Sequence, residues 1–198
     1  GTYTVALTAV NSAGGTNRTT RTYSVGTQSG YAYDVFHVAT NGNDSTGTGS
    51  AAAPWLTIAK AASVVTAGDY VAVHAGYYPE FVDISRDVAV STNRIQFIGY
   101  GARTSGFKVR VSNYTVRGFE LDYSVSDGAN SPQYTYQAAD NIHWIDNYVH
   151  DTPDGIRGVY VAATGDPAPT NGALNGRVDN CRFEDIGYIV VEISNGSN

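Results

Sequence analysis

The chain has 198 residues, of which 12 are Lys or Arg and 18 are Asp or Glu, giving a formal net charge of −6. The basic residues are scattered and form no patch with interleaved aromatics, so nucleic acid is excluded as an expected partner. The sequence has no apolar run of about 18 residues and no charged-then-apolar leader, so neither a membrane span nor a signal peptide is expected in it.

The composition is typical of a β-rich protein of the cell exterior. Hydrophobic residues make up 42% of the chain, whereas charged residues make up 15%, below the roughly 25% of ordinary globular domains. Ser, Thr, Asn, 22 Gly and 15 Tyr supply the polarity, and these residues suit pleated strands and tight turns. The single cysteine, Cys181, excludes an intrachain disulfide and is interpreted as a small buried residue. We therefore predict a secreted or cell-surface protein.

The two ends of the sequence indicate a piece of a longer protein. Met is absent altogether. Gly1 enters a strand pattern at once, and the last residues, Ile193–Asn198, follow an apolar run directly. We expect a processed product or a fragment.

The first residues predict a β-hairpin. Residues 2–10 alternate in a period of two, Asn11–Gly15 is a turn, and Thr16–Val25 is a second, Thr-rich strand. The wording "GTYTV…NSAGG" resembles the last two strands of polycystic-kidney-disease-type (PKD) or related immunoglobulin-like modules. The resemblance implies that residues 1–27 are the end of such a β-sandwich, and Gly26–Gly30 then forms a short linker.

A different pattern begins after residue 33. Val35–Val38 and Tyr70–Ala75 are predicted strands, and Thr57 is a good N-cap for a helix over Ile58–Val65 whose apolar residues share one face. Gly76–Glu80 is a predicted turn.

The run "FHVATNGNDSTGTG…APWLTIAKAASVVTAGDYVAVHAGYYPE" resembles the N-terminal entry segment of pectate-lyase-type proteins. The resemblance implies an all-β fold, a right-handed parallel β-helix, whose open end is capped by the short helix. Such a cap is needed because the first coil otherwise exposes apolar interior and unpaired strand edges. We therefore assign residues 28–198 to the β-helix, with the cap at 33–80 and coils at 81–198, the last coils of the domain being cut off.

A rough internal repeat supports stacked coils. It is found by aligning Val116, Trp144 and Val178. Three turn residues and three apolar residues then coincide, namely Gly118, Asp146 and Asn180, and Leu121, Val149 and Phe183. The intervals exceed a minimal coil, so we expect inserted loops at Ser124–Ala139 and Ala163–Ala173.

The same alignment predicts a column of polar side chains along adjacent strands about 4.8 Å apart. Asp122, His150 and Glu184 form it, with Tyr123, Asp151 and Asp185 beside or behind them, and the following loop adds Asp154 and Arg157. The candidate substrate-binding residues are Asp122, His150, Asp151, Asp154, Arg157 and Glu184. Calcium prefers oxygen ligands, so Asp122, Asp151, Glu184 and Asp185 are the candidate calcium ligands. The alternative is that all of these are solvated residues at strand ends.

The sequence does not identify a catalytic residue. The resemblance to pectate lyases implies β-elimination with Lys or Arg as base and calcium acidifying the proton, but neither Lys60 nor Lys108 is expected beside the acidic column. A glycosidase needs two carboxylates roughly 5–9.5 Å apart. Asp122 with Glu184, or Asp151 with Asp185, would satisfy that spacing, as would almost any pair in stacked coils.

Four sequons mark possible glycosylation sites, at Asn17, Asn43, Asn113 and Asn195. Three of the four histidines, His37, His74 and His143, have strand-like settings and are interpreted as structural.

Two functions remain open. The first is a carbohydrate-active protein, a secreted lyase or hydrolase whose partner is an extracellular polysaccharide. The second is a non-catalytic surface fibre, filament subunit or adhesin that binds copies of itself, by strand addition through the N-terminal hairpin and by stacking of coils.

Overall fold

The structure is a computed structural model in which the chain divides into two compact units, residues 1–32 and 33–198. The residues that the structure describes are 2–10, 16–24, 34–89, 93–126, 128, 131–135, 139–162 and 175–194.

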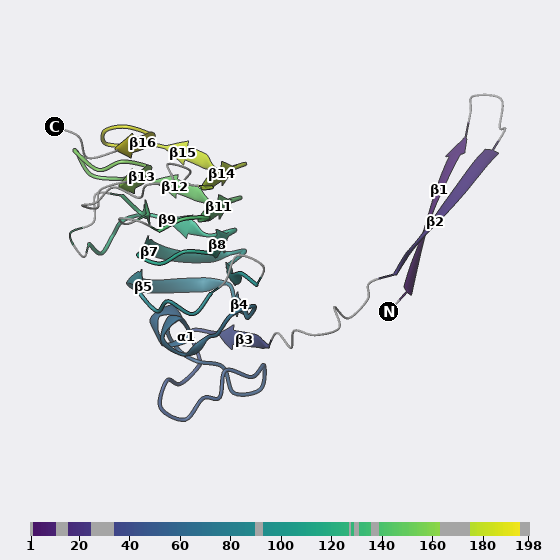
Figure 1. Cartoon of the computed structure of the whole chain (residues 1–198), viewed down its shortest axis with the longest axis horizontal. Coiled ribbons are helices and arrows are strands. Elements are labelled where there is room, and N and C mark those ends of the chain that lie inside the picture. Colours follow the sequence, from purple (N-terminus) through teal and green to yellow (C-terminus); the bar gives the residue numbers. More distant parts are fainter. Residues whose placement is uncertain are drawn as a thin grey trace. The chain divides into compact units, whose positions relative to one another are not determined.

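The first unit is a two-stranded antiparallel hairpin (Figure 1). Strand β1 (Thr2–Val10) pairs with β2 (Thr16–Ser24) in one uninterrupted register, from Thr2 opposite Ser24 to Val10 opposite Thr16. The predicted hairpin is confirmed. The predicted turn at 11–15 and the predicted linker at 26–30 lie outside the described residues.

The second unit is built almost entirely of short parallel strands (Figure 1). Its described part contains one helix, α1 (Ile58–Val64). The strands are β3 (Val35–Val38), β4 (Tyr70–Val73), β5 (Gly76–Ile84), β6 (Ile95–Ile98), β7 (Ala102–Val109), β8 (Tyr114–Arg117), β9 (Glu120–Leu121), β10 (Gln133–Thr135), β11 (His143–Ile145), β12 (Tyr148–His150), β13 (Val159–Ala162), β14 (Arg177–Asp179), β15 (Arg182–Glu184) and β16 (Val191–Ser194). The predicted all-β class is confirmed.

These strands form three parallel ladders, each a row of strands hydrogen-bonded side by side. The first ladder is β3–β4–β6–β8–β11–β14. The second and third ladders share the long strands β5 and β7. The first half of β7 pairs with β9, which continues the second ladder through β12 to β15. The second half of β7 pairs with β10, which continues the third ladder through β13 to β16, so the eight-stranded sheet divides into two ladders after β7.

The bend of β5 and β7 has a local cause. The register of β5 against β7 shifts between Tyr78 and Phe81, where Pro79 lies. Proline has no N–H to give to a ladder and is tolerated at such bulges. Opposite the bulge, a Cβ on Gly106 would lie 2.7 Å from the carbonyl oxygen of Pro132, so only glycine allows this close approach. The predicted turn at Gly76–Glu80 is wrong, because Tyr78 is buried and this segment is the first half of a strand.

The internal repeat is confirmed by the strand registers. Trp144 pairs with Val116 on one side and Val178 on the other. In the second ladder, Val149 pairs in the same way with Leu121 and Phe183. Apolar residues recur at the same position of successive strands in a ladder, and those of the inner strands, such as Val116, Trp144 and Val149, are buried in one core.

The predicted turn residues occupy left-handed backbone positions that stack from coil to coil. Gly118, Asp146 and Asn180 have φ of 77°, 54° and 50° at the corner between the first and second ladders. A second set, Tyr123, Asp151 and Asp185, has φ of 54°, 52° and 48° directly after the strands of the second ladder. Asn and Asp tolerate this conformation better than other non-glycine residues, which explains why Asp or Asn stands at four of these six corner positions.

Helix α1 forms as predicted. The Thr57 hydroxyl oxygen accepts a hydrogen bond from the Lys60 N–H at 3.1 Å, which is an N-cap. Ile58, Ala61 and Ala62 are buried. The free N–H groups of Ile58 and Ala59 donate to the Glu80 carboxylate at 2.8 and 3.0 Å, which ties the start of the helix to β5.

The inserted loop predicted at Ser124–Ala139 contains a strand. Gln133, Tyr134 and Thr135 form β10 and are buried between β7 and β13. Polar composition concealed the strand. The second predicted loop, Ala163–Ala173, lies outside the described residues.

Candidate functional site

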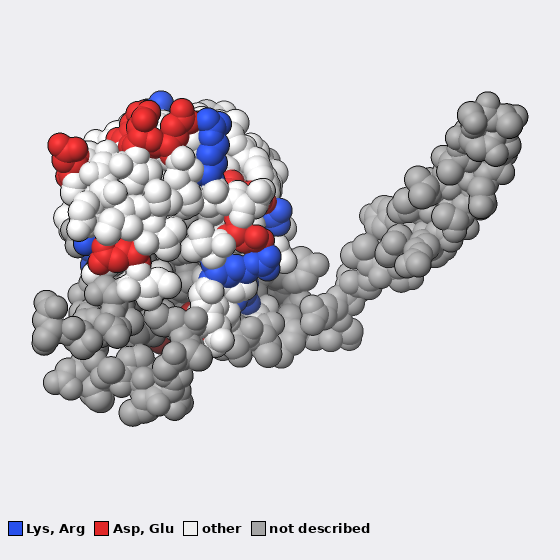
Figure 2. Space-filling view, turned by 90° about the horizontal axis from the view of Figure 1, so that it is seen from above, with Lys and Arg blue, Asp and Glu red and all other residues white. Residues whose placement is uncertain are grey.

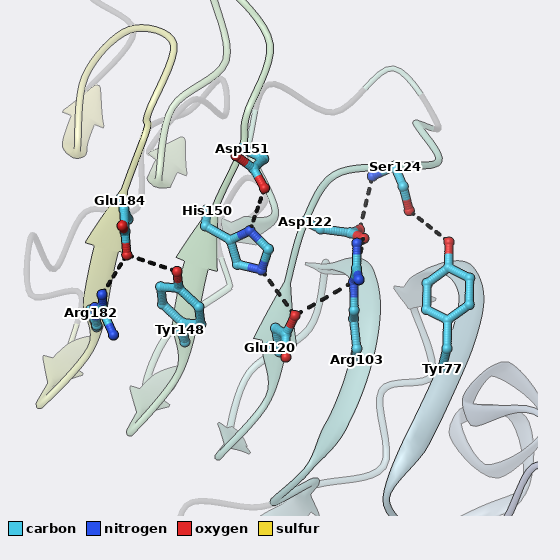
Figure 3. A network of polar contacts seen from close by, with 10 residues as sticks. All are labelled: Tyr77, Arg103, Glu120, Asp122, Ser124, Tyr148, His150, Asp151, Arg182 and Glu184. Atoms are coloured by element: carbon cyan, nitrogen blue, oxygen red, sulfur yellow. Dashed lines mark hydrogen bonds and ion pairs between the residues drawn. The ribbon is translucent and has the colours of Figure 1, made fainter.

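A row of polar side chains covers the outer face of the second ladder (Figure 3). Alternate residues of a strand point to opposite faces, so buried Leu121 and Val149 place their neighbours on the outside. Two columns result. The strand registers align Tyr77, Arg103, Glu120, Tyr148 and Arg182, and two residues further along each strand lie Ser105, Asp122, His150 and Glu184. These residues, together with Ser124 and Asp151, are called the second-ladder face.

Arg103 and Asp122 form the most buried ion pair of this face. The Arg103 Nε donates to Asp122 Oδ2 at 2.7 Å, and a second guanidinium nitrogen lies 2.6 Å from the same oxygen. Asp122 is only 5% exposed. Burial raises the pKa of its carboxyl, but hydrogen bonds from Ser124 and the charge of Arg103 outweigh burial and bring that pKa below its ordinary value.

His150 lies between two carboxylates. Its Nδ1 is 2.8 Å from Asp151 Oδ2 and its Nε2 is 3.1 Å from Glu120 Oε1. Ionised carboxylates only accept hydrogen bonds, so both contacts are satisfied together when the ring carries two N–H groups or when one carboxyl carries the proton. Asp151, His150 and Glu120 thus form a chain of polar contacts, and Glu120 is its half-exposed end near Arg103.

Tyr148 and Glu184 continue the face from β12 to β15. The Tyr148 hydroxyl donates to Glu184 Oε2 at 2.8 Å, and the exposed guanidinium of Arg182 also binds that oxygen. The Tyr148 ring lies between the Arg182 guanidinium, 4.7 Å from its centroid, and the His150 ring, at 4.5 Å. The hydrogen bond to Glu184 raises the pKa of Tyr148, so this hydroxyl is a donor and not a ready base.

At the opposite end of the face, over β5 and β7, the polar groups are mainly hydroxyls. The Tyr77 hydroxyl and Ser105 Oγ each lie 3.0 Å from Ser124 Oγ. The Arg103 guanidinium lies 5.3 Å above the Tyr77 ring. Aromatic rings, hydroxyls and charged groups therefore alternate along a single surface, which suits the apolar faces and hydroxyl edges of sugar rings.

The structure brings together part of the predicted site. Asp122, His150 and Glu184 lie in one column, as the alignment predicted, and Asp151 joins through His150. Asp185 is an exposed left-handed corner residue. Whether any of them binds substrate stays a prediction.

Arg157 and Asp154 lie elsewhere. Arg157 forms an ion pair with Glu192 of β16 in the third ladder, between the rings of Tyr160 and Tyr188 at 4.6 and 5.2 Å. Asp154 is exposed in the turn that precedes this segment. The sequence analysis placed Arg157 in one site with the acidic column. In the structure, Arg157 contacts the third ladder, whereas the acidic column lies on the second ladder.

The predicted calcium site gains no support from the geometry. Within the described residues, no group of three or more His, Cys, Asp or Glu side chains is arranged to hold a metal ion. Asp122 already accepts hydrogen bonds from Arg103 and from the Ser124 N–H on its two oxygens. Calcium binding remains a prediction.

The sequence reasoning missed one of the two columns. Glu120, Tyr148 and Arg182 lie two positions before Asp122, His150 and Glu184 and therefore point to the same face. The period of two along a strand was sufficient to find them. Arg103 was harder to find, because β7 belongs to a coil that the repeat alignment did not include.

The other singled-out residues have structural contacts. The Asn43 side-chain oxygen accepts from the N–H groups of Ser45 and Thr46, and Asn113 accepts from Asn141 at 2.7 Å in a stacked corner. Asn17 lies in β2, and Asn195 lies outside the described residues. Cys181 is only partly buried, where a buried residue was predicted; it packs against the core, and burial raises the pKa of its thiol.

Acidic and basic side chains lie next to each other on the face of the molecule shown in Figure 2, in small groups separated by uncharged surface. Among the described residues, no helix has the length and apolar character needed to cross a membrane.

The fold and the site define an all-β protein of stacked parallel strands with a polar and aromatic outer face. No protein-family model and no curated protein matches its sequence. Among solved structures, it is similar to a rhamnogalacturonan lyase, with a TM-score of 0.55 and 16% identity over 81% of this chain and 54% of the other. It is also similar to a GH136 lacto-N-biosidase from Eubacterium ramulus, with a TM-score of 0.51 and 11% identity over 76% of this chain and 34% of the other. The chain thus spans about half or less of the length of these carbohydrate-active proteins.

Proposed function

We propose that this chain is part of a protein that binds and cleaves an extracellular polysaccharide, with the second-ladder face as the surface that contacts the sugar chain. One observation carries the proposal: charged, hydroxyl and aromatic side chains line one face over five successive strands, from Tyr77 to Arg182. Five rungs span about 19 Å, long enough for several sugar rings.

The finer description of the fold belongs to this proposal. We assign the three ladders to the faces of a right-handed parallel β-helix, and the hairpin to the end of a PKD or immunoglobulin-like module. The parallel registers and the likeness to two carbohydrate-active proteins support the first assignment. The low charge and Thr-rich strands support secretion.

The charge balance of the face bears on the choice of substrate. Arg103 and Arg182 supply two positive charges, against four carboxylates on Glu120, Asp122, Asp151 and Glu184. Both guanidiniums already contact carboxylates. A polyuronate therefore needs an additional cation such as calcium at this face, whereas a neutral glycan does not.

Glu120 is the residue we propose to contact the reacting sugar, with His150 positioning it and exchanging its proton. A two-carboxylate hydrolysis through Asp122 and Glu184 is disfavoured, because they stand two rungs, or about 10 Å, apart and Asp122 is buried against Arg103. General acid or base catalysis by one positioned group contributes about 10²–10⁴-fold to a rate.

The test incubates the full protein with rhamnogalacturonan, pectate, alginate and neutral oligosaccharides, with calcium and with chelator. Unsaturated products are followed by ultraviolet absorbance, and new reducing ends are followed in parallel. Glu120→Gln and His150→Asn should lower the rate at least about 100-fold. Asp83→Asn is the matched control: it removes an exposed carboxylate, paired with Arg110 at 2.8 Å, that lies on the third ladder, and it should leave the rate unchanged.

The outcomes separate the parts of the proposal. Binding of a glycan without any product, lost in Glu120→Gln, retains the surface and removes the catalytic role. Neither binding nor product with any glycan of the panel contradicts the proposed function as a whole. Activity that chelator abolishes supports the calcium prediction.

A second candidate function, assembly of copies into a fibre, is favoured by the apolar residues of the last described coil. Ile193 is 70% exposed, and it lines an apolar hollow with Val178, Val191 and the buried Trp144. Exposed apolar surface of this kind is covered either by further coils of the same chain or by a second copy, and the fibre requires the second. A polymer seen by electron microscopy and dissolved by Ile193→Asp would support the fibre, whereas a monomer at all concentrations would remove it.

A further inference from the structure

Two histidines on the first ladder face each other across adjacent strands. His37 lies on β3, and His74 directly follows β4, which pairs with β3. Val38 and Val73 point into the core. Their sequence neighbours His37 and His74 therefore point outward, because side chains alternate between the two faces of a strand. His37 Nδ1 and His74 Nε2 are 3.0 Å apart, with the ring planes tilted by 54°.

This pair is held in place by its backbone. The His37 N–H donates to the Gly49 carbonyl at 2.7 Å, and its own carbonyl accepts from the Trp55 N–H at 3.0 Å. The His74 N–H donates to Val38 O at 2.8 Å, and its carbonyl accepts from the Tyr78 hydroxyl at 2.8 Å. The backbone positions from which the two rings project are therefore fixed, and only the ring orientations remain to be ordered when both contact a ligand.

We propose that His37 and His74 form a two-imidazole site for a divalent transition metal, Cu²⁺ first and Ni²⁺ next. The two ring nitrogens share one hydrogen bond, and a shared ion would take the place of its hydrogen, with each ring turning to aim a lone pair at the metal. Cu²⁺ is expected to bind more tightly than Ni²⁺ or Zn²⁺, because it stands highest in the order of affinities for nitrogen ligands.

The remaining ligand positions belong to water. No third His, Cys, Asp or Glu joins the pair in the part of the chain that the structure describes. Imidazole binds these metals and does not bind calcium, so the site differs in chemistry from the predicted calcium site and lies on a different ladder from the second-ladder face. It is independent of the proposed glycan function.

The experiment titrates the full protein with Cu²⁺, Ni²⁺ and Zn²⁺ by calorimetry, and records the copper spectrum by electron paramagnetic resonance. The expected result is one Cu²⁺ per chain, with hyperfine structure from two nitrogens, and weaker Ni²⁺ and Zn²⁺ binding. His37→Ala and His74→Ala should each weaken copper binding at least tenfold, as loss of even an indirect ligand contact costs about 10–100-fold. Each variant should also remove one nitrogen from the spectrum.

His150→Ala is the control, because His150 contacts carboxylates on the second-ladder face and should leave the copper site unchanged. Both variants of the pair change partly exposed side chains, and circular dichroism checks that the fold is kept. Equal copper affinity in wild type, His37→Ala and His74→Ala overturns the proposal. So does a copper dissociation constant above about 1 mM in the wild type.

Discussion

Two networks on neighbouring parts of the same coils contain nearly the same residue types. On the second-ladder face, Arg103 lies over the Tyr77 ring and binds Asp122. At the corner between the first and second ladders, Arg117 lies over the Tyr100 ring and binds Asp146 at 2.7 Å. Both Asp residues have a pKa below the ordinary value.

The two networks differ in their charge balance. At the corner, the Arg117 guanidinium and the Tyr100 hydroxyl both donate to Asp146 Oδ2, and Asp146 Oδ1 accepts from the Asn180 side chain at 2.8 Å. Both carboxylate oxygens of Asp146 accept hydrogen bonds from neighbouring side chains, which is consistent with a structural residue in a left-handed turn. On the second-ladder face, carboxylates outnumber guanidiniums and His150 carries two carboxylate contacts. This excess of carboxylates is the feature on which the proposed glycan site rests.

The largest effect on stability is expected from Arg103→Ala. It leaves the buried carboxylate of Asp122 without its cation, and loss of a hydrogen bond to a charged group costs about 2 kcal/mol. Arg117→Ala, the matched change at the corner, should cost less, because the Asp146 side chain is 19% exposed whereas that of Asp122 is 3% exposed, and water can solvate the carboxylate that remains. Urea unfolding of the two variants measures the difference. Equal losses would contradict the distinction between the fully buried and the partly buried carboxylate.

The dependence of the free energy of unfolding on acidic pH provides a second test of Asp122. The pKa of Asp122 in the folded protein is lower than its ordinary value of 3.8, so the unfolded chain takes up the proton first. The resulting stability is complete above pH 3.8 and is lost as the pH falls through the folded pKa. Asp122→Asn should flatten the loss of stability below pH 4 relative to wild type, as measured by urea unfolding at a series of pH values. An unchanged slope would mean that Asp122 does not differ between the folded and unfolded states.

A third test concerns His143 on the first ladder, whose protonation should change the stability of the protein closer to neutral pH. Burial first, and then the charges of Arg94 and Arg177, lower the pKa of His143 from its ordinary 6.5. The neutral ring accepts a hydrogen bond from Arg94 at 3.2 Å. Stability should therefore be complete above pH 6.5 and decline as the pH falls through the lower folded pKa. His143→Gln should remove this decline below pH 6.5, with thermal unfolding as the measurement; a decline that persists in the variant would assign it to another group.

The sequence predicted what recurs in every coil. Trp144, Val149 and their aligned partners were found because each coil must fill the same interior, and Asp146 and Asn180 were found because left-handed corners favour Asp and Asn. It also predicted one column of the second-ladder face, through Asp122, His150 and Glu184.

What escaped prediction depended on contacts between coils of unequal length. Arg103 pairs with Glu120 through β7 and β9, a shorter interval than the repeat, so alignment alone did not bring Arg103 to Asp122. Pro79 was interpreted as part of a turn, although it lies at a bulge inside β5. Neither the bulge nor the pairing partner of a short strand is encoded in local composition.

The smallest effect is expected at Asp185, where a site and a corner residue make opposite predictions. Its φ of 48° places it in the left-handed region, where Asp, Asn and Gly are tolerated and other side chains cost about 1–2 kcal/mol. If Asp185 is a corner residue, Asp185→Asn and Asp185→Gly should leave both thermal stability and glycan cleavage unchanged, whereas Asp185→Ala should lower stability alone. A calcium ligand behaves differently: Asp185→Asn and Asp185→Gly would both lower calcium-dependent activity without lowering stability. Loss of activity in the stable Asn and Gly variants would therefore restore Asp185 to the site.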